Sequence, residues 1–117
     1  MAQVFTKALL SGSTQGKGIK VVATGTPGTT IHTAVAGTSS LDEIWLYAYN
    51  SDTVTRTLTI EWGEATAPDG NNIIDIPSKQ GRFLVVDGRL LQNALVVKAF
   101  ASAANVIIID GFVNQIV

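Results

Sequence analysis

The sequence is a succession of short apolar runs, rich in β-branched residues, that are separated by turn-forming residues. Val, Ile and Thr lose side-chain freedom in a helix and fit the pleated surface of a strand. The Gly, Pro, Asn and Asp residues between the runs are typical of turns. The pattern therefore predicts an all-β chain of about eight short strands, arranged as an antiparallel β-sandwich, a jelly-roll-like fold or a small barrel.

The clearest strand signal lies at residues 54–62. Leu58, Ile60 and Trp62 alternate there with threonines and Glu61, which predicts a strand with one buried and one solvated face. Residues 44–49 are apolar or aromatic on both alternating faces, which predicts a strand covered on both sides. Further strands are expected at residues 4–10, 19–23, 29–35, 73–76, 82–86, 89–92, 95–101 and 106–117.

Two glycines carry specific expectations. Asp87-Gly88 fits a two-residue hairpin turn between two strands, and Gly111 within the last strand indicates a bulge or a close backbone approach. The length favours one domain, and we expect a single β-sandwich over residues 1–117. Its core is expected to contain apolar residues from both sheets, namely Trp45, Leu46, Leu58, Ile60, Phe83, Val85, Val96, Ile107 and Ile109.

The chain is short of charge for a small soluble domain. It is 46% hydrophobic and 15% charged, with a mean hydropathy of +0.31, whereas ordinary domains carry roughly 25% charged residues. A small domain leaves a large share of its surface exposed, so part of this surface is expected to be covered by other chains. The apolar residues near both ends are the expected interface: Val4, Phe5, Phe112, Ile116 and Val117.

The charges are unevenly distributed along the chain. Residues 1–40 hold three lysines and no acid, residues 41–75 hold seven acids against Arg56, and the remainder has a small positive excess. This asymmetry is consistent with scattered surface charge and, alternatively, with complementary edges that steer subunits together. No stripe of Lys and Arg interleaved with aromatic residues indicates nucleic-acid binding.

The sequence offers little for catalysis or cofactors. There is no cysteine and His32 is the only histidine, so neither a nucleophile–base set nor a common zinc site can be assembled. We expect His32 to hydrogen-bond a neighbour or to lie in a subunit contact. The loop at residues 12–18 departs from a phosphate-binding loop in spacing and context, and we expect a flexible connection instead. We expect no enzyme and no cofactor.

Three weaker motifs have structural explanations. Glu61 and Glu64 beside a tryptophan resemble a glycosidase pair, but a solvated strand end explains them. Residues 69–72 resemble the start of a calcium loop, and a turn explains them. The aromatic residues considered for sugar binding are Trp45, Tyr47, Tyr49 and Trp62. The first three share one face of a strand and would form a platform if exposed. We expect these rings in the core or at an interface instead, where aromatic residues also concentrate.

Several segments resemble small virion proteins of tailed bacteriophages, and together they span most of the chain. They lie at residues 30–37, 41–46, 58–63 with 67–69, and 95–100 through 109–114. The resemblance implies a structural virion protein, in particular a capsid decoration or cement protein, that is made in the bacterial cytoplasm. It implies as partners other copies of the chain, as a homotrimer, and the major capsid protein, with no membrane. Tail, collar or head-fibre proteins of the same particle and a carbohydrate-binding module stay open as alternatives.

Overall fold

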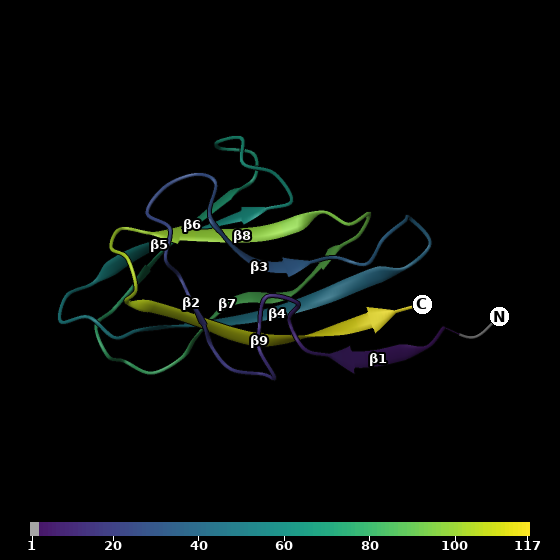
Figure 1. Cartoon of the computed structure of the whole chain (residues 1–117), viewed down its shortest axis with the longest axis horizontal. Helices are drawn as coiled ribbons and strands as arrows, with labels where there is room; N and C mark the ends of the chain where they lie inside the picture. The colour runs from purple at the N-terminus through teal and green to yellow at the C-terminus, as the bar shows by residue number, and fades with distance from the viewer. Residues whose placement is uncertain (1–2) are drawn as a thin grey trace.

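The computed structural model describes residues 3–117 and confirms the all-β prediction: two antiparallel sheets pack together as in a β-sandwich, and the described residues contain no helix (Figure 1). Accordingly, no helix in this part of the chain is suited to crossing a membrane. Residues 3–117 contain nine strands: β1 (Phe5–Ala8), β2 (Ile19–Lys20), β3 (Thr29–Thr33), β4 (Leu41–Asn50), β5 (Arg56–Trp62), β6 (Asn71–Ile76), β7 (Phe83–Leu91), β8 (Val96–Ala101) and β9 (Ile107–Ile116).

The first sheet is built on the two longest strands. Its order is β1-β9-β4-β7, and the short β2 also pairs with β9. β4 and β9 pair without interruption from Leu41 opposite Ile116 to Asn50 opposite Ile107. β1 and β2 follow one another along the other side of β9, so this edge of the sheet consists of two short strands joined by a loop.

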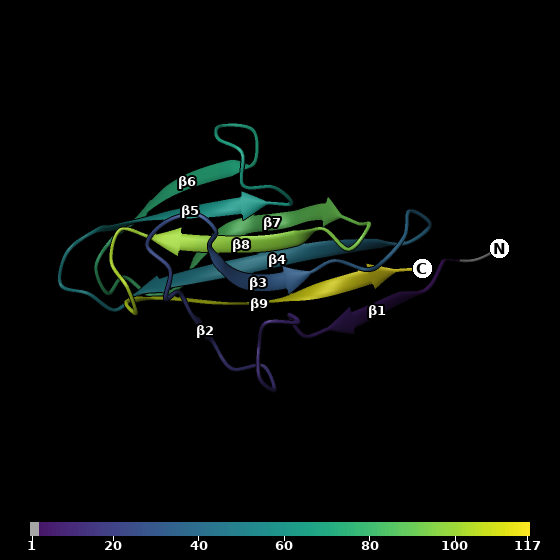
Figure 2. The same cartoon turned by 45° about the horizontal axis from the view of Figure 1, so that its top comes forward.

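The second sheet has the order β3-β8-β5-β6 and covers one face of the first, as the two views in Figures 1 and 2 show. Alternate residues of β4 and β8 are buried between the sheets, as a period of two requires. The core includes five of the nine residues expected there: Leu46, Leu58, Ile60, Ile107 and Ile109. Phe83 and Val85 are partly buried and pack against this core.

Two core assignments were wrong by one residue. Trp45 and Val96 lie half-buried on the outer faces of their sheets, and their neighbours Leu46 and Val97 point inward. Both positions of each pair are apolar, so the sequence pattern does not distinguish the two faces. β4 is accordingly covered fully on its inner side only.

The expected hairpin at Asp87-Gly88 is also wrong, because β7 runs straight through it. Ile44 pairs with Arg89 and Trp45 with Asp87, which leaves Gly88 as an extra residue in a β-bulge. Gly88 has a φ of 83° and the Trp45 ring lies against its Cα, where a Cβ would contact the indole. The left-handed conformation that a hairpin turn would need serves a bulge equally well.

The outer face of β5 is not solvated as expected. Thr59 and Glu61 are buried there, and the turn that precedes β3 supplies partners for Glu61. The Thr26 hydroxyl donates to Glu61 Oε2 at 2.6 Å, and the Gly28 amide donates to Oε1 at 2.7 Å. A turn 33 residues away in sequence from Glu61 therefore covers a face that local alternation marks as exposed.

The prediction of a close backbone approach at Gly111 is confirmed. Gly111 pairs with Leu46 within β9, at a φ of 151°, and a Cβ at this position would clash with the carbonyl oxygen of Trp45. β4 and β9 pack here more closely than any side chain would allow.

Gly111→Ala is expected to lower the free energy of unfolding by about 3 kcal/mol, because the clash is with backbone and the conformation disfavours a side chain. Urea denaturation followed by circular dichroism measures the change. Gly25→Ala is the matched control, since a Cβ there meets nothing within 4 Å, and it should change stability by less than about 0.5 kcal/mol. Equal effects of the two substitutions would contradict this account of Gly111.

Candidate functional site: an aromatic outer sheet face

The outer face of the first sheet carries a row of aromatic rings, which we call the outer aromatic face: Trp45, Tyr47 and Tyr49 from β4, and Phe112 from β9. All four are half-buried. Trp45 and Phe112 are direct cross-strand partners, and their rings stack with centroids 6.1 Å apart and planes 12° apart. No strand of the second sheet covers this face, because that sheet packs on the other side.

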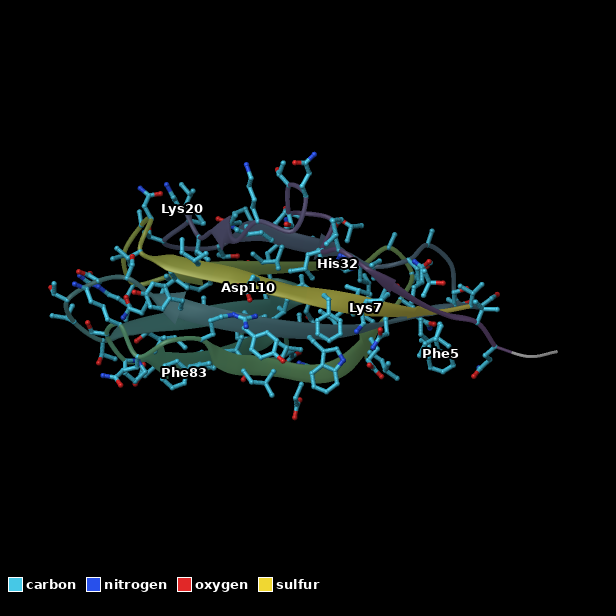
Figure 3. All side chains as sticks on the ribbon, turned by 90° about the horizontal axis from the view of Figure 1, so that it is seen from below. Phe5, Lys7, Lys20, His32, Phe83 and Asp110 are labelled. Atoms are coloured by element: carbon cyan, nitrogen blue, oxygen red, sulfur yellow. The ribbon has the colours of Figure 1, made fainter. Side chains whose placement is uncertain are left out.

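Two cations lie over these rings. Lys7 Nζ of β1 is 4.8 Å from the centre of the Phe112 ring, and the Arg82 guanidinium is 4.3 Å from the centre of Tyr47. Arg82 also donates three hydrogen bonds to Asp110, two from Nε and one from Nη2, and Asp110 lies opposite Tyr47 on β9. This hydrogen bonding raises the pKa of Arg82 above its ordinary value. Figure 3 looks onto this face, with Lys7 and Asp110 labelled.

The polar atom of the largest ring is already paired. Trp45 Nε1 donates to Glu43 Oε1 at 2.8 Å, and Asn114 Nδ2 donates to the same oxygen at 3.0 Å. The two hydrogen bonds, with that of Asn114 the larger influence, hold the pKa of Glu43 below its ordinary value. The indole therefore has a hydrogen-bond partner at its nitrogen and contacts both the Phe112 ring and the Gly88 bulge.

This arrangement suits contact with another surface rather than chemistry on a substrate. The rings of Trp45, Tyr47 and Phe112 already have partners within the chain, so they lose less conformational entropy on contact than free side chains would. The indole N–H has an acceptor within the chain and the Arg82 guanidinium is paired with Asp110, so covering the face would leave neither the indole N–H nor the Arg82 charge without a partner. The outer aromatic face offers apolar area and cations in fixed positions.

The five residues expected at an interface come together on two adjacent strands. Phe5 of β1 pairs with Ile116 of β9, and Val4 and Val117 exchange backbone hydrogen bonds of 3.1 and 2.9 Å just beyond. Val4, Phe5 and Val117 are 58%, 64% and 59% exposed, and Phe112 lies further along β9 in the outer aromatic face. Figure 3 shows Phe5 at the end of the sheet where the N-terminus lies.

His32 hydrogen-bonds a neighbour, as expected. Its Nε2 lies 2.7 Å from Asp42 Oδ2, and both side chains are buried between β3 and β4. The amide of Ser11 donates to His32 Nδ1 at 3.0 Å, so the ring proton is on Nε2 and is donated to Asp42. Asp42 also accepts from the Val35 amide and from Gln115.

This serine, histidine and aspartate do not form a catalytic triad. The backbone amide of Ser11, not its hydroxyl, faces the imidazole, and the hydroxyl accepts a hydrogen bond from the Thr33 amide at 2.7 Å. A nucleophilic serine would need its hydroxyl against the ring nitrogen. The cluster instead ties the two sheets and the loop after β1 together.

Asp42→Ala is expected to destabilise the fold by about 3 kcal/mol, because several buried donors lose their acceptor. Asp42→Asn keeps one acceptor oxygen and should cost about 1 kcal/mol. Thermal unfolding by calorimetry gives both values, with the exposed Asp87→Ala as control. A loss for Asp42→Ala no larger than that for Asp87→Ala would show that the cluster does not hold the sheets.

The two glutamates beside Trp62 do not act as a pair. Glu61 is buried and both its oxygens accept hydrogen bonds from the turn before β3, whereas Glu64 is exposed in the loop after β5. Both line a depression of about 260 Å³, together with Lys98 and Leu95. Glu61 therefore has a structural role, and the expectation of a solvated strand end is wrong for it.

The remaining sequence motifs lie in connections. Residues 12–18 form the loop between β1 and β2, and Asp69 lies in the turn before β6. Among the described residues, no group of three or more His, Asp or Glu side chains is placed to hold a metal ion. Trp62 belongs to the core, beneath Arg89, and so takes no part in the outer aromatic face.

Sequence reasoning identified the shared face of Trp45, Tyr47 and Tyr49 but missed the residues that organise it. The two-residue spacing of Glu43 and Trp45 was a usable signal for their contact, because residues two apart in a strand point to the same side. Lys7, Arg82 and Asn114 come from distant segments, and no local pattern links them to these rings.

Comparison with protein-family models, with curated proteins and with solved structures finds no match to this chain. Its function is therefore argued from its own residues.

Proposed function

We propose that this chain is a structural protein of a tailed-phage particle, and that it acts as a capsid decoration protein that assembles with copies of itself on the shell. The observation that carries the proposal is the exposed apolar surface at β1 and β9. Val4, Phe5 and Val117 are each more than half exposed, at an open sheet edge. Apolar side chains gathered on a small domain in this way are typical of surfaces that another protein covers.

The outer aromatic face supports the same proposal. It is continuous with Phe5 and Ile116 through the pairing of β1 with β9, and it presents aromatic rings and an Arg, which are enriched in protein interfaces. A decoration protein needs one surface for its own copies and another for the shell. The β1 edge and the outer aromatic face are two such surfaces.

A trimer fits the symmetry of a capsid, whose lattice offers three-fold sites. Each subunit then needs only a weak contact with the shell, because after the first contact the others become intramolecular. A trimer that binds only the mature shell stabilises that state by mass action.

Particles of the virus that encodes this chain should rupture at a lower temperature when they lack the protein. Release of DNA on heating, detected with an intercalating dye, measures the effect, and adding back the purified protein should restore the rupture temperature. Equal rupture temperatures would remove the cement function. A copy number far below that of the major capsid protein would favour a tail, collar or head-fibre location.

The outer aromatic face makes a carbohydrate-binding module the second candidate, because such modules present flat rings to sugars. Under our proposal, a panel of bacterial surface glycans should leave the fluorescence of Trp45 unchanged. A glycan-dependent shift that Tyr47→Ala removes without unfolding the chain would favour sugar binding instead. Phe100→Ala, a half-buried ring on the second sheet, is the matched control.

A further inference from the structure

Two edges of the sandwich carry charges of opposite sign. The basic edge, residues 4–22, comprises β1, β2 and their connecting loop. Its charged residues are all lysines: Lys7, Lys17 and Lys20. The acidic edge, residues 63–76, comprises β6 and the loop before it. Its charged residues are all acidic: Glu64, Asp69 and Asp75. The uneven distribution of charge along the sequence thus places positive and negative charges at two separate edges of the folded chain.

These edges lie on opposite sides of the molecule. The basic edge borders the first sheet, and its loop is bonded to β3 through the Gly12 amide and the Ile31 carbonyl at 3.0 Å. β6 is at the far end of the second sheet from β3. Figure 2 shows β6 at the top of the molecule, and β1 and β2 at the bottom.

Among the described residues, the charged groups of both edges form no ion pair, although Lys7 Nζ lies 4.8 Å from the centre of the Phe112 ring. The ion pairs among the described residues are His32–Asp42, Arg56–Asp52 and Arg82–Asp110, and none includes a lysine of the basic edge or an acid of the acidic edge. From the side chains that the structure describes, Asp75 accepts a hydrogen bond from the Thr57 hydroxyl alone. Lys98 lines the same depression as Glu64, and the acidic edge stays net negative with Lys98 included.

Each edge also has the strand and the apolar side chains that a contact requires. β1 and β6 are both terminal strands of their sheets, so one side of each has no neighbouring strand within the described part of the chain. Phe5 and Leu9 of the basic edge are 64% and 55% exposed, and Ile73 of the acidic edge is 64% exposed. Open strands of this kind pair with other chains unless something prevents it.

We propose that the basic edge of one copy docks on the acidic edge of a second copy, head to tail. Charge selects this arrangement: a two-fold contact would place lysines against lysines or carboxylates against carboxylates, whereas the head-to-tail contact joins opposite charges. Such a contact forms a closed ring when its rotation closes. The inference rests on the proposed self-assembly and names the surfaces that carry it.

The first test uses the unmodified protein. Its mass is measured by light scattering after size exclusion. The mass should fall from three times the 12.3 kDa chain mass toward that of a single chain as NaCl rises from about 0.05 to about 0.5 M. The reason is that salt screens exposed charges beyond roughly 10 Å at 0.1 M. A mass that does not depend on salt, or a monomer in low salt, overturns the inference.

Charge reversal provides the second test. The triple variant Lys7→Glu, Lys17→Glu, Lys20→Glu should be monomeric, and so should Glu64→Lys, Asp69→Lys, Asp75→Lys. The chain that combines all six substitutions should regain the original mass, because its edges are again complementary. Lys79→Glu and Asp87→Lys alter exposed charges outside both edges. These two control variants should keep the original mass of the assembly.

Circular dichroism separates loss of association from loss of folding in each variant. A folded triple variant that keeps the original mass, or a folded six-substitution chain that stays monomeric, overturns the inference. Binding to purified shells is read separately. A salt-sensitive ring that does not bind shells contradicts the decoration function alone, and a chain that binds shells as a monomer overturns the head-to-tail contact alone.

Discussion

The pairing of β4 with β9 is the constraint on which the rest of the structure depends. Ten residues of each strand pair in one register, and this pairing fixes which side chains point inward. Ile44, Leu46 and Ala48 then form the core, while Trp45 and Tyr47 lie outside. Because side chains alternate with a period of two, a shift by one residue would exchange the core for the outer aromatic face. Gly111 secures the register, since only glycine tolerates the approach of the Trp45 carbonyl.

The few buried polar side chains attach the remaining segments to this central pair. Asp42 and Asn50, at either end of β4, are both buried. Asp42 binds His32 of β3, and Asn50 donates hydrogen bonds to the carbonyls of Val54 and Ile76 at 2.9 Å. Each connects the first sheet to segments of the second. In a small domain without disulfides, such satisfied polar contacts specify how the sheets meet.

How far the sequence predicts this structure depends on whether a signal is local. The strand β5 and the inward side chains Leu58 and Ile60 follow from alternation within a few residues, and they were predicted correctly, except that the strand was expected from residue 54 and begins at Arg56. The burial of Glu61 was not, because its cover comes from the distant Thr26 and Gly28. The bulge at Gly88 was mistaken for a turn, because the same backbone conformation serves both and only the partner strand β4 distinguishes them.

The candidate surface follows the same rule. Apolar composition near the ends of the chain predicted an interface at Val4, Phe5, Phe112, Ile116 and Val117, but the proximity of the two ends arises from the pairing of β1 with β9. The aromatic residues of β4 were recognised as one face, yet the side of the sandwich on which they lie was not. Alternation sets which residues share a face, and only packing of the second sheet decides which face is outside.

The scarcity of charge and its placement have one physical explanation under the proposed assembly. On the outer aromatic face, charged side chains have hydrogen-bond partners within the chain. Arg82 donates to Asp110, and Glu43 accepts from Trp45. Along the basic edge, the exposed charges that form no ion pair are all positive, and along the acidic edge they are all negative. Apolar contacts are strong but have little directional preference, whereas like charges exclude wrong orientations. A chain that must assemble in one orientation on a large surface gains from this division: apolar faces supply the contact area, and the few free charges decide which edge meets which.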